Sequence, residues 1–314
     1  MNALPMVVPE PGLPNRVTIH EVGPRDGLQN ESTVVPAHVK AEFIRRLAET
    51  GLTTIEATSF VPPSWVPQLA DAAEVFTEVE GMLAKVDLPV LVPNQRGLDR
   101  ALELGARHVA VFASATETFA RRNLNRGLEE ALDMFAPVVA RATASGAGVR
   151  TRGYLSMCFG DPWEGAVDPA QVVDVGVRLI QMGCWQLSLG DTIGVATPGQ
   201  VTDMIDRFAR AGIGTDRLAV HFHDTYGQAL SNTLAALRAG VATVDASAGG
   251  LGGCPYAKSA TGNLATEDLV WMLTGLGVDT GVDLGRLVAT STWMAEHLGR
   301  PSPSRTVRAL AGEK

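Results

Sequence analysis

Lysine, cysteine and long hydrophobic runs are all scarce in this sequence, and each scarcity excludes a class of protein. Only four of the 26 basic residues are lysines, no basic run is present and the formal net charge is −8, so a nucleic-acid-binding surface is not expected. The three cysteines, Cys158, Cys184 and Cys254, are too few and too widely spaced for a disulfide framework. No run of about 18 apolar residues occurs, so no membrane span is expected.

The first fifteen residues, MNALPMVVPEPGLPN, lack the basic start and the continuous apolar core of a targeting signal. We interpret them as a loose, proline-rich lead. Together with the low cysteine content, this favours a cytoplasmic enzyme.

Eight short β-rich segments alternate with longer amphipathic stretches. The expected strands are RVTIHEV from Arg16, TTIEATSF from Thr53, KVDLPVLV from Lys85, HVAVFAS from His108, VRTRGYLSM from Val149, WQLSLGD from Trp185, LAVHFHD from Leu218 and TVDASA from Thr243. The expected helices cover 37–50, 67–79, 128–144, 169–182, 198–211, 228–239 and 284–298. Glycines 51, 105, 183, 212 and 240 each follow a helical pattern, as C-terminal caps would.

Repeated β-then-α units predict a parallel (β/α)₈ barrel of the TIM type with a C-terminal helical extension. A doubly wound sheet is the alternative, but no G-x-G-x-x-G motif follows the first strand. We expect residues 1–15 to form the lead, 16–283 one catalytic barrel, and 284–314 a helix followed by a polar tail. Because barrels of this kind often pair, a homodimer is our working expectation.

The active site of such a barrel lies at the C-terminal ends of its strands, so polar residues there are candidates. The first two strands contribute Glu21, Arg25, Asp26, Gln29 and Glu56. The later strands contribute Arg152, Tyr154, Ser156, Asp191, Thr192, His221 and His223.

His221 and His223 form the sharpest local pattern. Residues two apart on a strand point to the same face, so both imidazoles can bind one cation. Asp26 and Asn263 also lie at strand ends. Two imidazoles with carboxylate and amide oxygens suit Mg²⁺, Mn²⁺ or a similar octahedral ion, and no cysteine cluster with zinc spacing is present.

Three further features each allow a structural and a chemical interpretation. Arg25 and Asp26 can form a surface ion pair, but Gly23, Pro24 and Gly27 around them favour rigid placement at the barrel mouth. Asp191 can cap a helix or take a hydrogen-bonding role at the site. Cys254 follows four glycines in five residues, which is typical of a mobile lid, whereas Cys158 and Cys184 are expected to pack in the core.

These motifs together resemble the 3-hydroxy-3-methylglutaryl-CoA lyase family of metallolyases over nearly the whole chain. The most specific stretches are EVGPRDGLQNE, TSFVPPSWVPQ, SLGDTIGVATPG, VHFHDTYGQALSNT and GLGGCPYAKSATGNLATEDLV. The wider superfamily of condensing synthases shares the barrel, H-x-H and G-D-T-x-G, but lacks the glycine-cysteine loop.

The resemblance implies roles for particular residues. Asp26, His221, His223 and Asn263 match the metal ligands, and Glu267 matches a glutamate in the metal's second shell. Arg25 matches the arginine that faces the thioester, Glu56 and Asp191 match further acids of the site, and Cys254 matches the loop cysteine. Arg25, Gln29 and Tyr154 are expected to contact the substrate.

Two stretches depart from the family pattern. This chain has S-A-G-G-L-G-G-C where relatives have S-V-A-G-L-G-G-C, and F-G-D-P-W-E-G where a Cys-Pro-Tyr is common. Both changes are expected near the acyl pocket, so they leave the exact acyl group open.

The resemblance implies cleavage of 3-hydroxy-3-methylglutaryl-CoA to acetyl-CoA and acetoacetate with a divalent metal ion. Asp26 or His221 would take the proton of the substrate hydroxyl, Arg25 would stabilise the thioester enolate, and Cys254 or a histidine would return a proton to it. The alternatives are a lyase for another branched acyl-CoA (citramalyl-CoA or an isohexenylglutaryl analogue), a Claisen-type synthase, and a non-catalytic barrel that only binds metal or CoA.

Overall fold

Nine short strands build the sheet within the residues that the structure describes. The computed structural model describes residues 4–145, 148–253 and 262–312. The strands are β1 (Thr18–Glu21), β2 (Thr54–Ile55), β3 (Thr58–Ser59), β4 (Val90–Leu91), β5 (His108–Ser114), β6 (Arg150–Ser156), β7 (Gln186–Asp191), β8 (Leu218–Phe222) and β9 (Thr243–Ala246). Their order is β2-β1-β9-β8-β7-β6-β5-β4-β3, and all neighbours pair in parallel.

The stretch from β2 to β3 closes this sheet into a barrel. On one side the N–H of Glu56 donates to the carbonyl of Glu21 at 2.8 Å, and on the other the N–H of Ala57 donates to the carbonyl of Pro89 at 2.9 Å. One short segment therefore joins both edges, and β2 and β3 together take the place of one barrel strand. The predicted parallel (β/α)₈ barrel is confirmed, whereas the expected single second strand is two short strands, β2 and β3, separated by Glu56 and Ala57.

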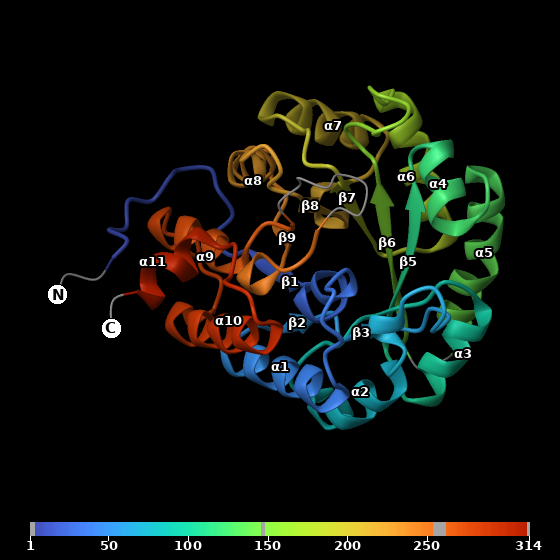
Figure 1. Cartoon of the computed structure of the whole chain (residues 1–314). Coiled ribbons are helices and arrows are strands. Elements are labelled where there is room, and N and C mark those ends of the chain that lie inside the picture. Colours follow the sequence, from blue (N-terminus) through green and yellow to red (C-terminus); the bar gives the residue numbers. More distant parts are fainter. Residues whose placement is uncertain (1–3, 146–147, 254–261, 313–314) are drawn as a thin grey trace.

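Helices surround the strands on all sides (Figure 1). They are α1 (Ala37–Glu49), α2 (Ala72–Val79), α3 (Gln95–Glu103), α4 (Glu117–Leu124), α5 (Leu128–Ala144), α6 (Pro169–Met182), α7 (Pro198–Arg210), α8 (Ala229–Arg238), α9 (Thr266–Gly275), α10 (Leu284–Leu298) and α11 (Arg305–Ala311). The expected helices 128–144, 169–182 and 284–298 have the predicted bounds. The five glycines predicted to follow helices all have positive φ, for example +115° at Gly183.

The structure corrects two expected helical regions. The expected helix 67–79 is instead a single 3-10 turn, Pro67–Leu69, followed by α2. The expected polar tail contains α11, whose first turn is held by its own N-cap residue and by a distant carboxylate. Ser304 accepts from the N–H of Val307 at 3.1 Å, and Asp268 of α9 accepts from the N–H of Thr306 at 2.7 Å. Sequence periodicity did not reveal α11 because Asp268 is remote in the chain.

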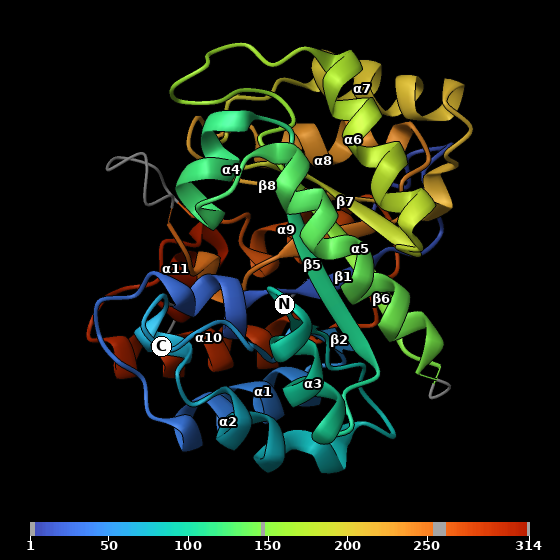
Figure 2. The same cartoon turned by 90° about the vertical axis from the view of Figure 1, so that its right-hand side faces the viewer.

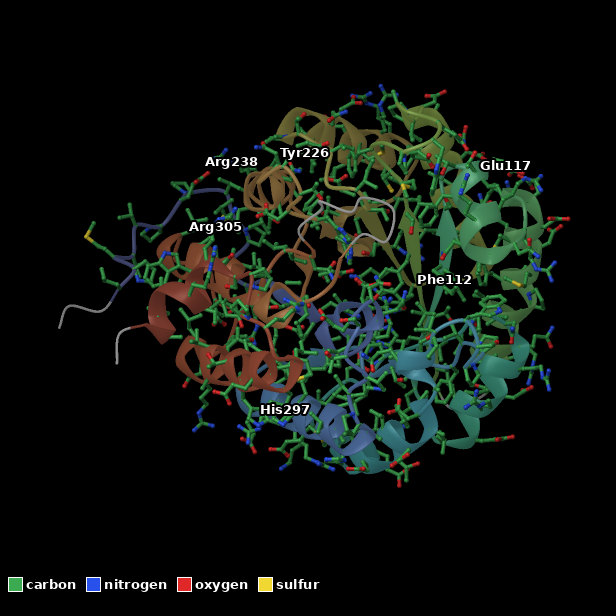
Figure 3. The ribbon with its side chains drawn as sticks, viewed as in Figure 1. Phe112, Glu117, Tyr226, Arg238, His297 and Arg305 are labelled. Carbon is green, nitrogen blue, oxygen red and sulfur yellow. The ribbon has the colours of Figure 1, made fainter. Side chains whose placement is uncertain are left out.

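The N-terminal lead is attached to the outside of the barrel. The N–H of Val8 donates to the carbonyl of Gly275 at 2.9 Å, and Glu10 pairs with Arg238 of α8 at 2.7 Å. Figure 3 shows Arg238 on the rim of the molecule beside this segment. The expectation of a loose lead is therefore wrong for residues 8–10. No helix in the described part of the chain is long and apolar enough to cross a membrane.

Two layers of side chains fill the molecule. Apolar residues of the helices pack against the outer face of the strands. Figure 2 shows helix α5 beside β5, with which it is in contact. The inner face is partly polar: Arg152 of β6 and Asp245 of β9 are both fully buried and form an ion pair at 2.6 Å. The C-terminal strand ends then open into a cavity.

Candidate active site

A cavity of about 640 Å³ lies at the C-terminal ends of the strands. Several strands contribute to its wall, among them β6 through Tyr154 and β8 through His221. All three residues expected to contact the substrate, Arg25, Gln29 and Tyr154, line this cavity. The cavity thus lies where the active site of such a barrel is expected, at the C-terminal ends of the strands.

Asp26, His221 and His223 come together at the cavity. Each offers one ligand atom, and these atoms lie within 4.8 Å of one another. The Nδ2 of Asn263 donates to Asp26 Oδ2 at 2.8 Å, which places the fourth expected ligand beside them. Asn263 Oδ1 and His223 Nδ1 are buried without a hydrogen-bond partner in the described structure. Buried polar atoms normally have partners, so this donor set fits a divalent cation.

The short segment Gly23–Gly27 forms one turn of π-helix that positions Arg25 and Asp26. A Cβ on Gly23 would lie 2.6 Å from Glu21 Oε1, and one on Gly27 would lie 2.7 Å from Ser247 Oγ. Both glycines are therefore required by close packing. The turn holds the two charged side chains at the mouth, as the G-P-R-D-G pattern suggested.

Arg25 joins two carboxylates. Its Nε donates to Glu56 Oε2 at 2.8 Å, and its Nη1 donates to Asp26 Oδ1 at 2.7 Å. Burial opposes a charged Arg25, but Glu56 and Asp26 outweigh it and raise the pKa of the guanidinium. Burial would also raise the pKa of Asp26, yet Arg25 and the two histidines lower it to about 2. Burial raises the pKa of Glu56 despite Arg25.

Asp191 holds the turn that follows β7. Its carboxylate accepts from the N–H groups of Val195 at 2.9 Å and Ala196 at 3.0 Å. Burial raises its pKa to about 6, against these hydrogen bonds. Thr197, not Asp191, caps α7, and Thr192 rather than Asp191 lines the described cavity wall. In this structure the Asp191 carboxylate therefore binds the backbone of the loop that follows β7.

Two buried glutamates hold the turn Ala248–Gly250 at the start of the glycine-rich segment. Glu21 accepts from the N–H of Ala248 at 2.8 Å, and Glu267 accepts from the N–H of Gly249 at 2.9 Å. Burial raises the pKa of Glu21 to about 7 and that of Glu267 to about 8. Glu267 thus supports the backbone at Gly249, at the start of the glycine-rich segment.

Cys254 lies outside the described residues, so its expected role is a prediction from the sequence alone. The preceding residue, Gly253, lines the cavity and accepts from Asn30 Nδ2 at 3.1 Å. Cys158 and Cys184 are buried, as expected, and burial raises the pKa of the Cys184 thiol to about 12. The divergent stretch 159–165 does not line the described cavity wall, but its Trp163 ring centroid lies 4.3 Å from the guanidinium carbon of Arg122, which does.

Sequence reasoning missed two contributions to the site. Helix α4 brings Arg122 and Asn123 to the cavity, although no strong apolar pattern had predicted it. Asp245 lies on β9 beside His221, and its Oδ2 is 3.3 Å from His221 Nδ1. Alternation along TVDASA could have placed Asp245 on the inner face, but only barrel closure shows which histidine it meets.

The comparisons with known proteins agree with this geometry. The HMGL-like family matches residues 16–294. A mitochondrial hydroxymethylglutaryl-CoA lyase of Arabidopsis thaliana is 54% identical over 95% of this chain, which spans 63% of that protein. A cytoplasmic 3-hydroxy-3-methylglutaryl-CoA lyase of Rattus norvegicus is 47% identical over 95% of this chain, which spans 86% of that protein.

Solved structures give the same result. The crystal structure of a hydroxymethylglutaryl-CoA lyase from Pseudomonas aeruginosa superposes with a TM-score of 0.93 at 46% identity. The match covers 96% of this chain and 100% of that one. Fold and sequence therefore point to the same group of proteins.

Proposed function

This chain belongs to the HMGL-like family, and from that premise we propose that it cleaves 3-hydroxy-3-methylglutaryl-CoA to acetyl-CoA and acetoacetate. The observation that carries the proposal is one cavity that contains both Arg25 and the cluster of Asp26, His221 and His223. An enzyme that breaks a carbon–carbon bond beside a thioester needs a cation for the hydroxyl and a positive charge for the enolate. A barrel that only binds metal or CoA would not require Arg25 and the cluster of Asp26, His221 and His223 in the same cavity.

The proposed cofactor is Mg²⁺ or Mn²⁺, held by Asp26, His221, His223 and Asn263. The unpartnered Asn263 Oδ1 and His223 Nδ1 support this assignment. Mixed oxygen and imidazole donors favour a hard or borderline divalent ion. When bound, such an ion acidifies a hydroxyl next to it and fixes its orientation.

Cleavage then requires three contributions from the chain. Asp26 or His221 accepts the proton of the tertiary hydroxyl, and the bond between the second and third acyl carbons breaks. The electron pair moves onto the departing thioester, where the guanidinium of Arg25 neutralises the charge on the oxygen. Cys254 or a histidine donates a proton to the enolate carbon, which completes acetyl-CoA.

Glu56 and Asp191 are proposed to act through other groups. Glu56 accepts from Arg25 Nε and so fixes the guanidinium plane. Asp191 fixes the loop that presents Thr192 to the cavity. Gln29 and Tyr154 would bind the substrate, since both line the cavity wall.

The remaining proposals concern partners and location. The partner is an acyl-CoA, and a homodimer is proposed on the precedent of other barrels. We propose a cytoplasmic location, while relatives carry both mitochondrial and cytoplasmic names.

A substrate panel tests the proposed function. Purified protein with Mg²⁺ is incubated with 3-hydroxy-3-methylglutaryl-CoA, citramalyl-CoA and a longer branched analogue. Acetyl-CoA release is measured for all three substrates, and acetoacetate release for the methylglutaryl substrate. The methylglutaryl substrate should be cleaved with the highest kcat/KM. Preference for another acyl group, or release of free CoA from acetyl-CoA plus a keto acid without any cleavage, would refute the assigned substrate.

A further inference from the structure

Asp245 is a fully buried carboxylate beside the candidate metal cluster. Arg152 contacts both of its oxygens, with Nη2 donating to Oδ1 at 2.6 Å and Nη1 donating to Oδ2 at 3.0 Å. Ser188 Oγ donates to the same Oδ2 at 2.8 Å. His221 Nδ1 lies 3.3 Å from this oxygen, because His221 and Asp245 are register partners on β8 and β9.

The two histidines of the cluster differ in what lies beside the Nδ1 atom of the imidazole. Nδ1 of each histidine is buried without a hydrogen bond of standard geometry in the described structure, but Nδ1 of His221 lies 3.3 Å from the Asp245 carboxylate. A proton on Nδ1 of His221 is attracted by Asp245, and this leaves the lone pair on Nε2. Only Nε2 is then available to a cation shared with Asp26.

We propose that Asp245 is a positioning residue for His221: it fixes the orientation and tautomer of the imidazole so that Nε2 faces the metal site. The inference rests on the metal site of the proposed function. Carboxylates commonly orient metal-binding histidines in this way, and their loss weakens metal affinity. Arg152 and Ser188 in turn hold the carboxylate in place.

The competing explanation is that Asp245 serves only as the counter-ion of Arg152. Both side chains are completely buried, so removal of either one leaves an uncompensated charge and destabilises the fold. The experiment therefore has to separate loss of charge balance from loss of histidine positioning.

Three variants achieve this separation. Asp245→Asn removes the charge, and the Arg152→Gln/Asp245→Asn double variant removes both charges of the pair. Asp87→Asn is the matched control, because Asp87 also bonds an arginine of β6, Arg150, and a histidine, His108, each at 2.8 Å. That cluster lies at the opposite ends of the strands from the cavity.

Binding of Mn²⁺ is titrated without substrate, and thermal unfolding is recorded in parallel. Asp245→Asn and the double variant should both bind Mn²⁺ about 10- to 100-fold more weakly than wild type, while Asp87→Asn binds normally. The double variant should recover thermal stability relative to Asp245→Asn but not metal affinity. Recovery of both properties would assign Asp245 a counter-ion role only and overturn the inference.

The ¹⁵N spectrum of histidine-labelled wild type provides a readout that does not depend on the variants folding. With Mg²⁺ added, His221, assigned by its absence in His221→Gln, should carry its proton on Nδ1. A proton on Nε2 would overturn the inference. Normal Mn²⁺ binding without cleavage of 3-hydroxy-3-methylglutaryl-CoA would refute the proposed substrate alone, whereas wild type that binds no Mn²⁺ would refute the metal site and this inference together.

Discussion

Replacement of Glu267 by glutamine should remove a pH dependence from the stability of the fold. Glu267 is fully buried on α9, where it accepts from the N–H of Gly249 and the hydroxyl of Ser291. Burial raises its pKa from 4.5 to about 8, and the neighbouring Glu21 acts in the same direction. Glutamine has nearly the same shape and mimics the protonated acid.

The direction in which stability changes with pH depends on how many protons the folded and unfolded states bind. Between pH 4.5 and about 8 the folded protein keeps a proton on Glu267 that the unfolded chain has lost, so stability falls as the pH rises. A difference of 8 − 4.5 = 3.5 pH units corresponds to about 5 kcal/mol at most. Glu267→Gln has no such titration, so its advantage over wild type should grow through this window.

Urea unfolding of both proteins at pH 5, 6.5 and 8, without added metal, measures this advantage. Glu74→Gln, which removes an exposed glutamate from α2, is the control and should follow the wild-type curve. If the difference between Glu267→Gln and wild type is the same at pH 5 and pH 8, then Glu267 does not hold a proton in the folded state and the reasoning is refuted.

Three further predictions concern the chemistry. Arg25→Gln should lower kcat by about 10²- to 10³-fold, because a charged donor to the enolate is lost; a change in KM alone would assign Arg25 to ground-state binding. Chelation should abolish turnover and Mg²⁺ or Mn²⁺ should restore it, while His223→Ala should weaken Mn²⁺ binding in a titration; full activity in excess chelator would contradict the metal assignment. Cys254→Ser should reduce turnover and leave Mn²⁺ affinity intact, because a hydroxyl is a far weaker acid than a thiol, and normal turnover would exclude Cys254 as proton donor.

The sequence by itself determined the barrel and the composition of its mouth. Helix periodicity and the glycines that follow helices are local properties, so the bounds of α5, α6 and α10 could be predicted. Parallel strands bring their C-terminal ends to one side. Asp26 and Asn263, although 237 residues apart, could therefore be assigned together with His221 to one site.

Only the tertiary structure decided what each polar group contacts. Asp191 binds the backbone of its own loop, and Glu267 binds the turn at Gly249. Asp245 meets Arg152 and His221 because β6, β8 and β9 enclose one narrow interior. A strand pattern tells which face a side chain takes but not which residue stands across the barrel, since that depends on closure and register.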